Sequence, residues 1–231
     1  ELKPLSHANA KRIYCILQSL FKFAVTQGYI KETPCKNIIL PKKNPLEEEK
    51  QMYITAEELP KFLNLFKGYS SFNTIILVLL YTGMRSGECL GLQWEDIDFE
   101  NKTVSINKQI TKQSSRENWR FVPPKTKKSN RVLPLTKVLL NDLKTLKESD
   151  KEILFGFNDK FFVVGDIAPA SNNRFSDRKN KNCEKAGVKQ IRLHDFRHSC
   201  ASLLIYKGAS INMVSKFLGH SKIEETLNTY T

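Results

Sequence analysis

A β-rich, strongly basic stretch in the middle of a helical chain constrains the fold of this sequence most. Residues 103–107, 119–122 and 131–135 are short, rich in β-branched or aromatic residues, and separated by polar turns. This pattern is typical of short antiparallel strands. On both sides of the stretch, apolar residues recur at intervals of three and four, which indicates amphipathic helices. We therefore expect an α+β fold that is mainly helical, with one small antiparallel sheet.

A polar segment divides the chain. Residues 8–27 read as an amphipathic helix that Gly28 ends. Residues 44–51 have no hydrophobic period and contain a proline, so we interpret them as a linker. Thr55 and Glu58 then form the sequence pattern of a capping box. We expect a first helical domain over residues 1–43 and a second domain over 52–231.

The second domain contains several recognisable helix ends. A buried helix is expected at 72–81, ended by Gly83, and a short helix capped by Ser86 should follow it. Thr136 should cap a helix that runs to about residue 147. A basic helix at 172–186 is expected to end at Gly187.

The charge of the chain indicates a polyanionic partner. The net charge is +13, and the isoelectric point is about 9.5. Such an excess favours nucleic acid or an anionic membrane surface. Nine basic residues and one acid, Glu117, lie between Asn101 and Arg131, a local excess of +8 (nine minus one). A bound phosphate backbone would relieve the repulsion among these charges.

The composition also gives expectations about membrane association, cellular location and cofactors. No apolar run approaches the roughly 18 residues that a membrane span needs, so we expect no membrane partner. The five cysteines are odd in number and form no CxxC pair, which favours reduced thiols in a cytoplasm. We expect neither a metal nor an organic cofactor.

The last forty residues carry the side chains that point to chemistry. His194 and Arg197 are spaced i, i+3, so on a helix both would project from one face and could grip an anion. His220 follows Gly219 at an expected helix end, and Tyr230 lies about ten residues beyond. Histidine, arginine and tyrosine in a basic protein suggest phosphate chemistry. Arg85, followed by Glu88 three residues on, is more often a local salt bridge than a functional pair.

These pieces together resemble one family. TGMRSGE around Arg85, PKTKKSNR around Lys125, HDFRH at 194–198, LGH at 218–220 and the later tyrosine are similar to the tyrosine recombinases, or phage-type integrases. The resemblance is greatest to integrases of temperate phages and conjugative transposons of low-GC Gram-positive bacteria. It covers residues 52–231, and residues 1–43 resemble the C-terminal part of that family's helical core-binding domain. The family usually has more of that domain and a C-terminal tail, both of which we expect to be missing here.

The resemblance implies a site-specific recombinase acting through a 3′-phosphotyrosyl intermediate and a Holliday junction. It assigns Tyr230 as nucleophile, Arg85, Arg197 and His220 as stabilisers of the phosphorane, and His194 as proton acceptor or orienting residue. Glu88 is expected to support Arg85. Composition does not choose a general acid among Lys125, Lys127 and Lys128, but Pro123 and Pro124 restrict the backbone before Lys125. The resemblance also points to Lys125.

Partners follow from the same interpretation. We expect double-stranded DNA at attachment or transposon-end sites, a tetramer on that DNA, and accessory DNA-bending or directionality factors. The residues expected to contact DNA are the basic ones of the first helix, the hairpin and the basic helix: Lys11, Arg12, Arg120, Lys127, Lys128, Arg131, Arg174 and Arg178.

Several alternatives stay open at this point. HDFRH has the i, i+4 histidines of a zinc protease helix, but Arg197 would place a cation on the metal face and no third ligand motif follows. A Xer-type resolvase, a relaxing topoisomerase or a non-catalytic DNA-binding relative also fits the pattern. His198 is expected to be a packing residue, and Tyr81 and Tyr206 are expected to lie in the core.

Overall fold

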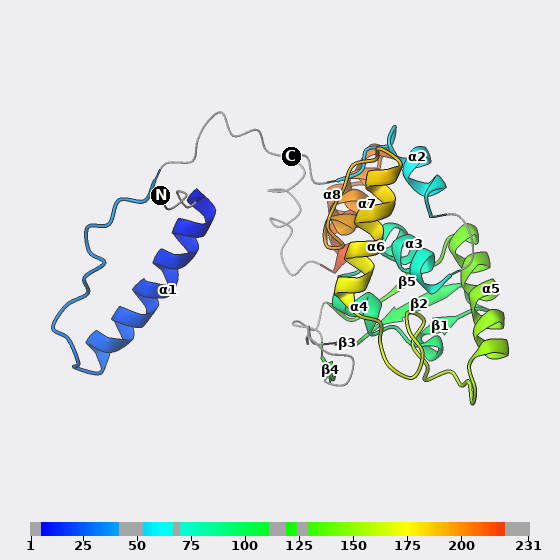
Figure 1. Cartoon of the computed structure of the whole chain (residues 1–231), viewed down its shortest axis with the longest axis horizontal. Helices are drawn as coiled ribbons and strands as arrows, with labels where there is room; N and C mark the ends of the chain where they lie inside the picture. The colour runs from blue at the N-terminus through cyan, green and yellow to red at the C-terminus, as the bar shows by residue number, and fades with distance from the viewer. Residues whose placement is uncertain (1–5, 42–52, 67–69, 111–118, 124–128, 220–231) are drawn as a thin grey trace. The chain divides into compact units, whose positions relative to one another are not determined.

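The computed structural model describes residues 6–41, 53–66, 70–110, 119–123 and 129–219. The chain divides into two compact units, Glu1–Gln51 and Met52–Thr231 (Figure 1). Among the described helices, none combines the length and apolar character that crossing a bilayer requires.

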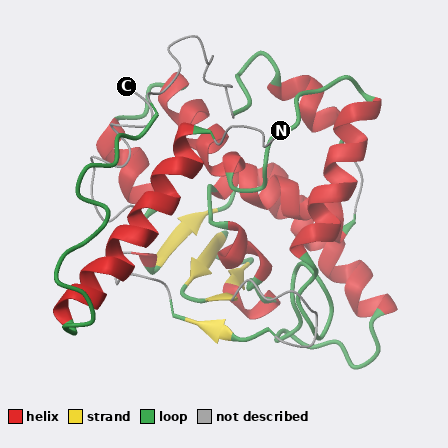
Figure 2. Cartoon of the chain, turned by 60° about the vertical axis from the view of Figure 1, so that its left-hand side comes forward, coloured by secondary structure: helices red, strands yellow, loops and turns green. Residues whose placement is uncertain are grey.

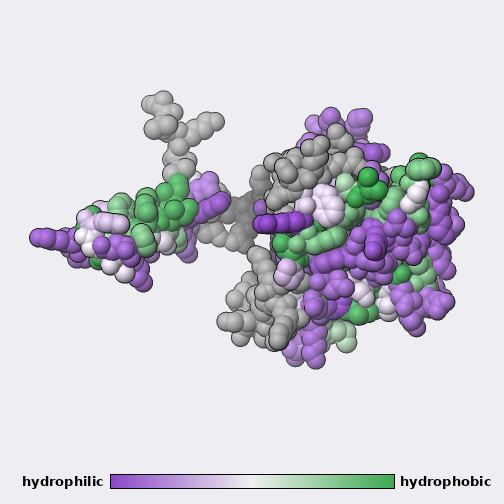
Figure 3. Space-filling view, turned by 90° about the horizontal axis from the view of Figure 1, so that it is seen from below, coloured by the Kyte–Doolittle hydropathy of each residue, from purple (hydrophilic) through white to green (hydrophobic). Residues whose placement is uncertain are grey.

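The described part of the first unit contains one long helix, α1 (His7–Thr26). The Ser6 side chain accepts a hydrogen bond from the Asn9 N–H at 3.4 Å and caps the helix, while Gly28, at φ +74°, follows its end. Large apolar side chains are exposed along α1, and apolar residues gather on this unit in Figure 3. They are Ile13, Ile16, Leu17, Leu20 and Phe23.

The second unit is α+β, as expected, and mostly helical. Its elements in chain order are α2 (Leu59–Asn64), α3 (Ser71–Thr82), α4 (Ser86–Leu90), η1 (Trp94–Asp96), β1 (Ile97–Asp98), β2 (Thr103–Ile106), β3 (Gln109–Ile110), β4 (Phe121–Val122), β5 (Arg131–Pro134), α5 (Lys137–Ile153), α6 (Asn172–Lys185), α7 (Asp195–Tyr206) and α8 (Ile211–Leu218). Figure 2 shows the short strands gathered together within this unit.

The strands of the described residues form two small antiparallel sheets, where one was expected. The first has the order β1-β2-β5, with Val104 opposite Leu133. The second pairs β3 with β4, so the expected strand at 119–122 does not join the others and is shortened to two residues. The sequence periodicity missed β1 and β3 because two-residue strands are too short to show alternation.

The central helix of the core is α3, which packs against α4, α5 and α7. Ile75, Ile76 and Leu79 on α3 are fully buried. A chain of aromatic contacts then connects the helices: the ring centroids of Phe62 and Phe66 are 4.9 Å apart, and those of Phe62 and Phe196 are 5.6 Å apart. These contacts fix α7 against α2.

Most of the expected helix ends are present. Thr55 and Glu58 exchange both capping-box hydrogen bonds, at 3.0 and 3.2 Å. Thr136 caps α5, which extends to Ile153 rather than to about residue 147. The helix after Arg85 is an exception, because Ser86 is its first helical residue and Arg85 itself occupies the cap position. Tyr206 was also wrongly placed, since its side chain is largely exposed.

Candidate active site

The site begins at the turn that ends α3. Gly83 adopts the left-handed conformation, at φ +59°, and its N–H donates to the Leu79 carbonyl at 3.0 Å. A Cβ on Gly83 would lie 2.5 Å from Leu218 Cδ2 and 3.1 Å from Cys200 Sγ. Only glycine therefore permits both the turn and the close approach of α7 and α8.

Arg85 lies two residues after Gly83, at the N-terminus of α4. The Glu88 carboxylate accepts from the Arg85 backbone N–H at 2.8 Å and from Arg85 Nη1 at 3.1 Å. The Arg85 side chain keeps 31% of its surface exposed, whereas that of Glu88 keeps 1%. The carboxylate thus fixes the backbone and one edge of a guanidinium that can still reach solvent or a ligand.

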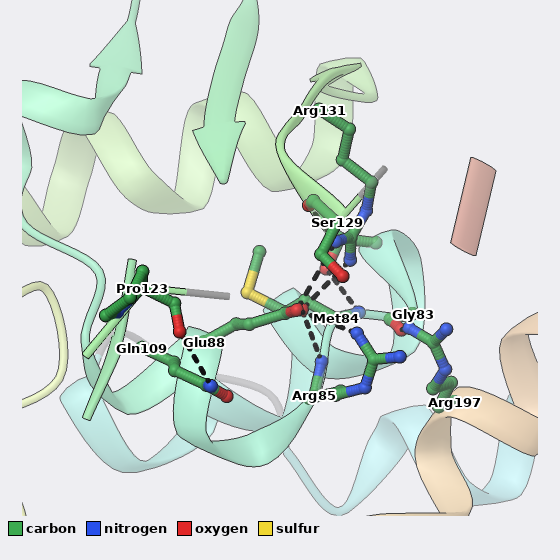
Figure 4. Close-up of polar contacts among 10 residues, drawn as sticks. Gly83, Met84, Arg85, Glu88, Gln109, Pro123, Ser129, Arg131 and Arg197 are labelled. Atoms are coloured by element: carbon green, nitrogen blue, oxygen red, sulfur yellow. Dashed lines mark hydrogen bonds and ion pairs between the residues drawn. The ribbon is translucent and has the colours of Figure 1, made fainter. Parts of the chain in front are cut away.

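A second arginine, Arg131 at the start of β5, holds the other side of Glu88. Its Nη2 donates to Glu88 Oε2 at 3.0 Å, and its Nη1 donates to the Ser129 carbonyl at 3.0 Å (Figure 4). Burial by itself would raise the pKa of Glu88, but the hydrogen bonds and positive charges of Arg131 and Arg85 outweigh it, and the pKa is lowered. Glu88 is therefore ionised at neutral pH.

Arg197 brings a further guanidinium to the same turn. Its Nη1 donates to the Gly83 carbonyl at 2.9 Å, and its side chain is buried. In Figure 4, Arg85, Arg131 and Arg197 converge on the segment from Gly83 to Glu88. The three guanidiniums and the Glu88 carboxylate of this segment carry a net charge of +2 (three minus one), which favours binding of an anion such as a phosphate.

The start of α7 is fixed by a second buried carboxylate that the sequence reasoning did not single out. Asp195 accepts from the Arg192 backbone N–H and Nε, both at 2.9 Å, and from Arg192 Nη2 at 3.0 Å. The Ser199 hydroxyl donates to the Asp195 carbonyl at 3.0 Å and accepts from the Ile54 N–H at 2.9 Å. The acid three residues after Arg192 was the available sequence signal.

His194 occupies the cap position before α7 rather than its first turn. Its ring is exposed in part, and its centroid lies 5.7 Å from that of His198. Partial burial, followed by the neighbouring His198 and Arg197, lowers the pKa of His194. The imidazole is therefore neutral at pH 7 and able to accept a proton.

Six of the residues expected in the site or on DNA lie at least in part outside what the structure describes. Lys125, Lys127, Lys128, His220 and Tyr230 lie outside the described residues, as does the side chain of Arg174. Among the residues that the structure does describe, no three His, Cys, Asp or Glu side chains come together as a metal site would require. All five cysteines are unpaired.

The basic residues expected on DNA differ in exposure. Lys11 and Arg12 on α1, Arg120 and Arg178 are exposed, and the Arg178 guanidinium lies 4.4 Å from the Phe72 ring centroid. Arg131 is different, because its side chain is only 7% exposed and is paired with Glu88. Its guanidinium is therefore held by Glu88, and a contact between Arg131 and DNA stays a prediction.

Comparison with known proteins decides the family. The pattern of the phage integrase family matches residues 52–231, which is most of the chain. The chain belongs to the phage integrase family. This confirms the resemblance drawn from the motifs around Arg85 and Arg197.

Relatives of this integrase-family chain include an integrase, a tyrosine recombinase and a transposase. The ICEBs1 integrase of Bacillus subtilis is 32% identical over 98% of this chain and 62% of its own length. A XerC-like tyrosine recombinase of Caldanaerobacter subterraneus subsp. tengcongensis gives the same three figures. The transposase of transposon Tn916 from Enterococcus faecalis is 27% identical over 81% of this chain and 47% of its own length. The chain thus spans less than two thirds of these relatives.

Solved structures support the same fold. The Tn1549 transposon integrase, solved in complex with a circular intermediate DNA, superposes with a TM-score of 0.77 at 22% identity and covers 99% of this chain and 76% of that one. The XerA recombinase superposes with a TM-score of 0.63 at 16% identity, over 100% of this chain and 80% of that one. This integrase-family chain therefore has the fold of tyrosine recombinases.

Proposed function

We propose that this protein is a site-specific DNA recombinase that integrates or excises a mobile element. The observation that carries the proposal is the cluster of Arg85 and Arg197 on one glycine turn, with Glu88 holding Arg85 in place. Two guanidiniums fixed beside each other suit the non-bridging oxygens of a phosphodiester. Family membership supports the same reaction.

In the proposed reaction, the phenolate of Tyr230 attacks a DNA phosphorus atom. A 3′-phosphotyrosyl bond forms and the bond to the 5′ oxygen breaks, so a 5′-hydroxyl leaves after protonation by Lys125. Arg85, Arg197 and His220 stabilise the charge of the phosphorane, and His194 accepts the phenol proton or orients the ring.

The phosphotyrosyl bond retains the energy of the broken bond. The 5′-hydroxyl of a partner strand can therefore reverse the step without ATP or metal chemistry. Two strand exchanges, each by two of four protomers, would pass through a Holliday junction. The proposed partners are double-stranded DNA at attachment or transposon-end sites and accessory bending or directionality factors, in a bacterial cytoplasm.

A second candidate is a Xer-type resolvase of the same family. It is favoured by the XerC-like relative, which is as similar to this chain as the ICEBs1 integrase is. The chemistry would be the same, but the recombined site would lie on the host chromosome.

Trapping the covalent adduct tests the proposal. Wild-type protein is incubated with genomic and element DNA, and covalently attached DNA is isolated under denaturing conditions and sequenced. Element ends among the attached DNA would support an integrase, and a chromosomal resolution site would support the Xer-type alternative. Tyr230→Phe should bind DNA with an affinity similar to wild type, because one hydroxyl adds little to a large charged interface.

The adduct should be absent from Tyr230→Phe and present in the matched control Tyr206→Phe, whose ring is exposed at the end of α7. An adduct on Tyr230→Phe would move the nucleophile to another tyrosine. No adduct from wild type on any of these DNAs would favour a DNA-binding protein without catalysis.

A further inference from the structure

Arg131 belongs to an ion-pair network with Glu88 and Arg85, and the proposed reaction gives Arg131 itself no role. Its side chain is 7% exposed and that of Glu88 is 1% exposed, whereas Arg85 on the other side of the carboxylate is 31% exposed. The side chains of Arg131 and Glu88 are therefore both buried, and that of Arg85 is the most exposed of the three. Only Arg85 is positioned to meet a ligand.

The hydrogen bonds divide the carboxylate between the two arginines. Glu88 Oε2 accepts from the Arg85 backbone N–H at 2.8 Å and from Arg131 Nη2 at 3.0 Å. Glu88 Oε1 accepts from Arg85 Nη1 at 3.1 Å and from Arg131 Nη1 at 3.4 Å. Each oxygen thus has two donors, which fills the ordinary capacity of a carboxylate.

Because Arg131 donates to both oxygens of Glu88, the carboxylate has fewer lone pairs left to accept hydrogen bonds from Arg85. Within the described residues, the carboxylate engages one N–H of the Arg85 guanidinium. A carboxylate that lacked Arg131 would have two lone pairs to fill in a buried place, and the adjacent guanidinium could satisfy both through a two-point contact. In that contact the Glu88 carboxylate would bind the Arg85 guanidinium more fully. The carboxylate would then compete with a phosphate for the same guanidinium.

We propose that Arg131 is a positioning residue of the active site, which shares the Glu88 carboxylate and thereby leaves the outer edge of the Arg85 guanidinium available to a DNA phosphate. The inference rests on the proposed function, because it assigns the phosphate as the ligand of Arg85. This positioning role is distinct from direct contact between Arg131 and DNA, and also from a purely structural role in folding.

The first test compares Arg131→Met with wild type for DNA affinity and for the rate of adduct formation at saturating protein. DNA affinity should stay within about threefold, because the buried guanidinium adds little to phosphate binding. The cleavage rate should fall by roughly 10- to 100-fold, less than the roughly 10²- to 10³-fold for outright loss of one transition-state donor, because Arg131 acts only through Arg85. Lys147→Met is the control for general damage, since it removes a mostly buried ammonium on α5 that lies 2.6 Å from the Asp159 carboxylate.

The second test is the pH dependence of the ratio between variant and wild-type rates. The described charged groups that face Glu88 are Arg85 and Arg131, and Cys89 is its neighbour in sequence. Without Arg131, burial should raise the pKa of Glu88, so acid would neutralise the carboxylate and release Arg85. The rate ratio should therefore rise as the pH falls from about 8 to about 5.5. A purely structural role would leave the ratio flat.

The Glu88→Gln background completes the test. There Arg131→Met should change the rate by less than about threefold, because no carboxylate competes for Arg85. If the single Arg131→Met variant does not fold, the comparison in the Glu88→Gln background still tests the inference. An equal loss in both backgrounds, a flat pH ratio, or a loss of DNA affinity as large as the loss of rate would overturn the inference. Wild type that forms no adduct would instead refute the proposed function, whereas wild type and Arg131→Met cleaving equally would refute this inference alone.

Discussion

At the scale of single residues, buried charges decide where the protein gains and loses stability. Glu88 and Asp195 are both buried, and each has an arginine as partner at 3.1 Å or less. Such pairs are expensive to break, because removing one partner leaves a buried charge without compensation, at a cost of about 3–5 kcal/mol. They hold the ends of α4 and α7 in register at the site.

Asp150, near the end of α5, shows the opposite behaviour. Burial raises the pKa of Asp150 to about 6. The folded state therefore holds the proton more tightly than the unfolded chain, whose Asp titrates near 4. The stability that this carboxyl contributes is present at acidic pH and is lost as the pH rises from about 4 through about 6.

Asp150→Asn should consequently raise the free energy of unfolding at pH 7.5 by up to about 1 kcal/mol, after allowance for partial exposure. The gain should vanish near pH 4. Urea unfolding over a pH series measures it, with Glu152→Gln, an exposed carboxyl on the same last turn, as the control for the helix dipole. An equal gain at both pH values would mean that burial of Asp150 is not the cause.

At the scale of elements, the end of α3 is the joint on which the site depends. Gly83 and Gly187 both follow helices and share φ +59°, but a Cβ on Gly187 would meet nothing within 4 Å. Gly187→Ala should therefore cost only the left-handed strain, about 1–2 kcal/mol. Gly83→Ala should cost that strain plus roughly 1–3 kcal/mol for the clash with Leu218 and Cys200.

Urea unfolding of the two glycine variants provides the comparison. Gly83→Ala should also reduce cleavage of DNA at temperatures where it is folded, because the Gly83 carbonyl accepts from Arg197. Equal stability losses for the two variants would show that α8 adjusts to the added methyl group and that the joint is less tight than the structure indicates.

At the scale of the whole molecule, the net charge of +13 should govern the rate and affinity of encounter with the proposed DNA partner. Basic residues are exposed on α1, beside β4 and on α6, so several phosphates should be neutralised and their counterions released. DNA affinity should fall by roughly 10³-fold or more between about 50 mM and 200 mM salt, as measured by fluorescence anisotropy.

Adduct formation should be unchanged by EDTA in the same buffers, because the proposed chemistry uses only side chains and the DNA. A flat salt dependence would argue against a phosphate-dominated interface. Activity that chelation abolishes and zinc restores would return the HDFRH histidines to the role of metal ligands.

The elements of the fold were largely predictable because their signals are local. The caps at Thr55 and Thr136, the helix ends at Gly83 and Gly187, and the basic helix now seen as α6 depend on neighbours within a few residues. The family motifs around Arg85 and Arg197 were equally readable. The pairing of β4 with β3 was not, because strand partners are chosen by contacts distant in sequence.

The sequence by itself determined the mainly helical α+β class, the basic character and the family, since these depend on composition, periodicity and motif spacing. Only the tertiary structure decided which residue Arg131 contacts. In sequence Arg131 is one of nine basic residues in a charged stretch and lies 43 positions from Glu88. In the folded protein its Nη2 lies 3.0 Å from Glu88 Oε2. A buried carboxylate needs cations close to it in the folded structure, and spacing along the chain does not predict which arginine will supply them.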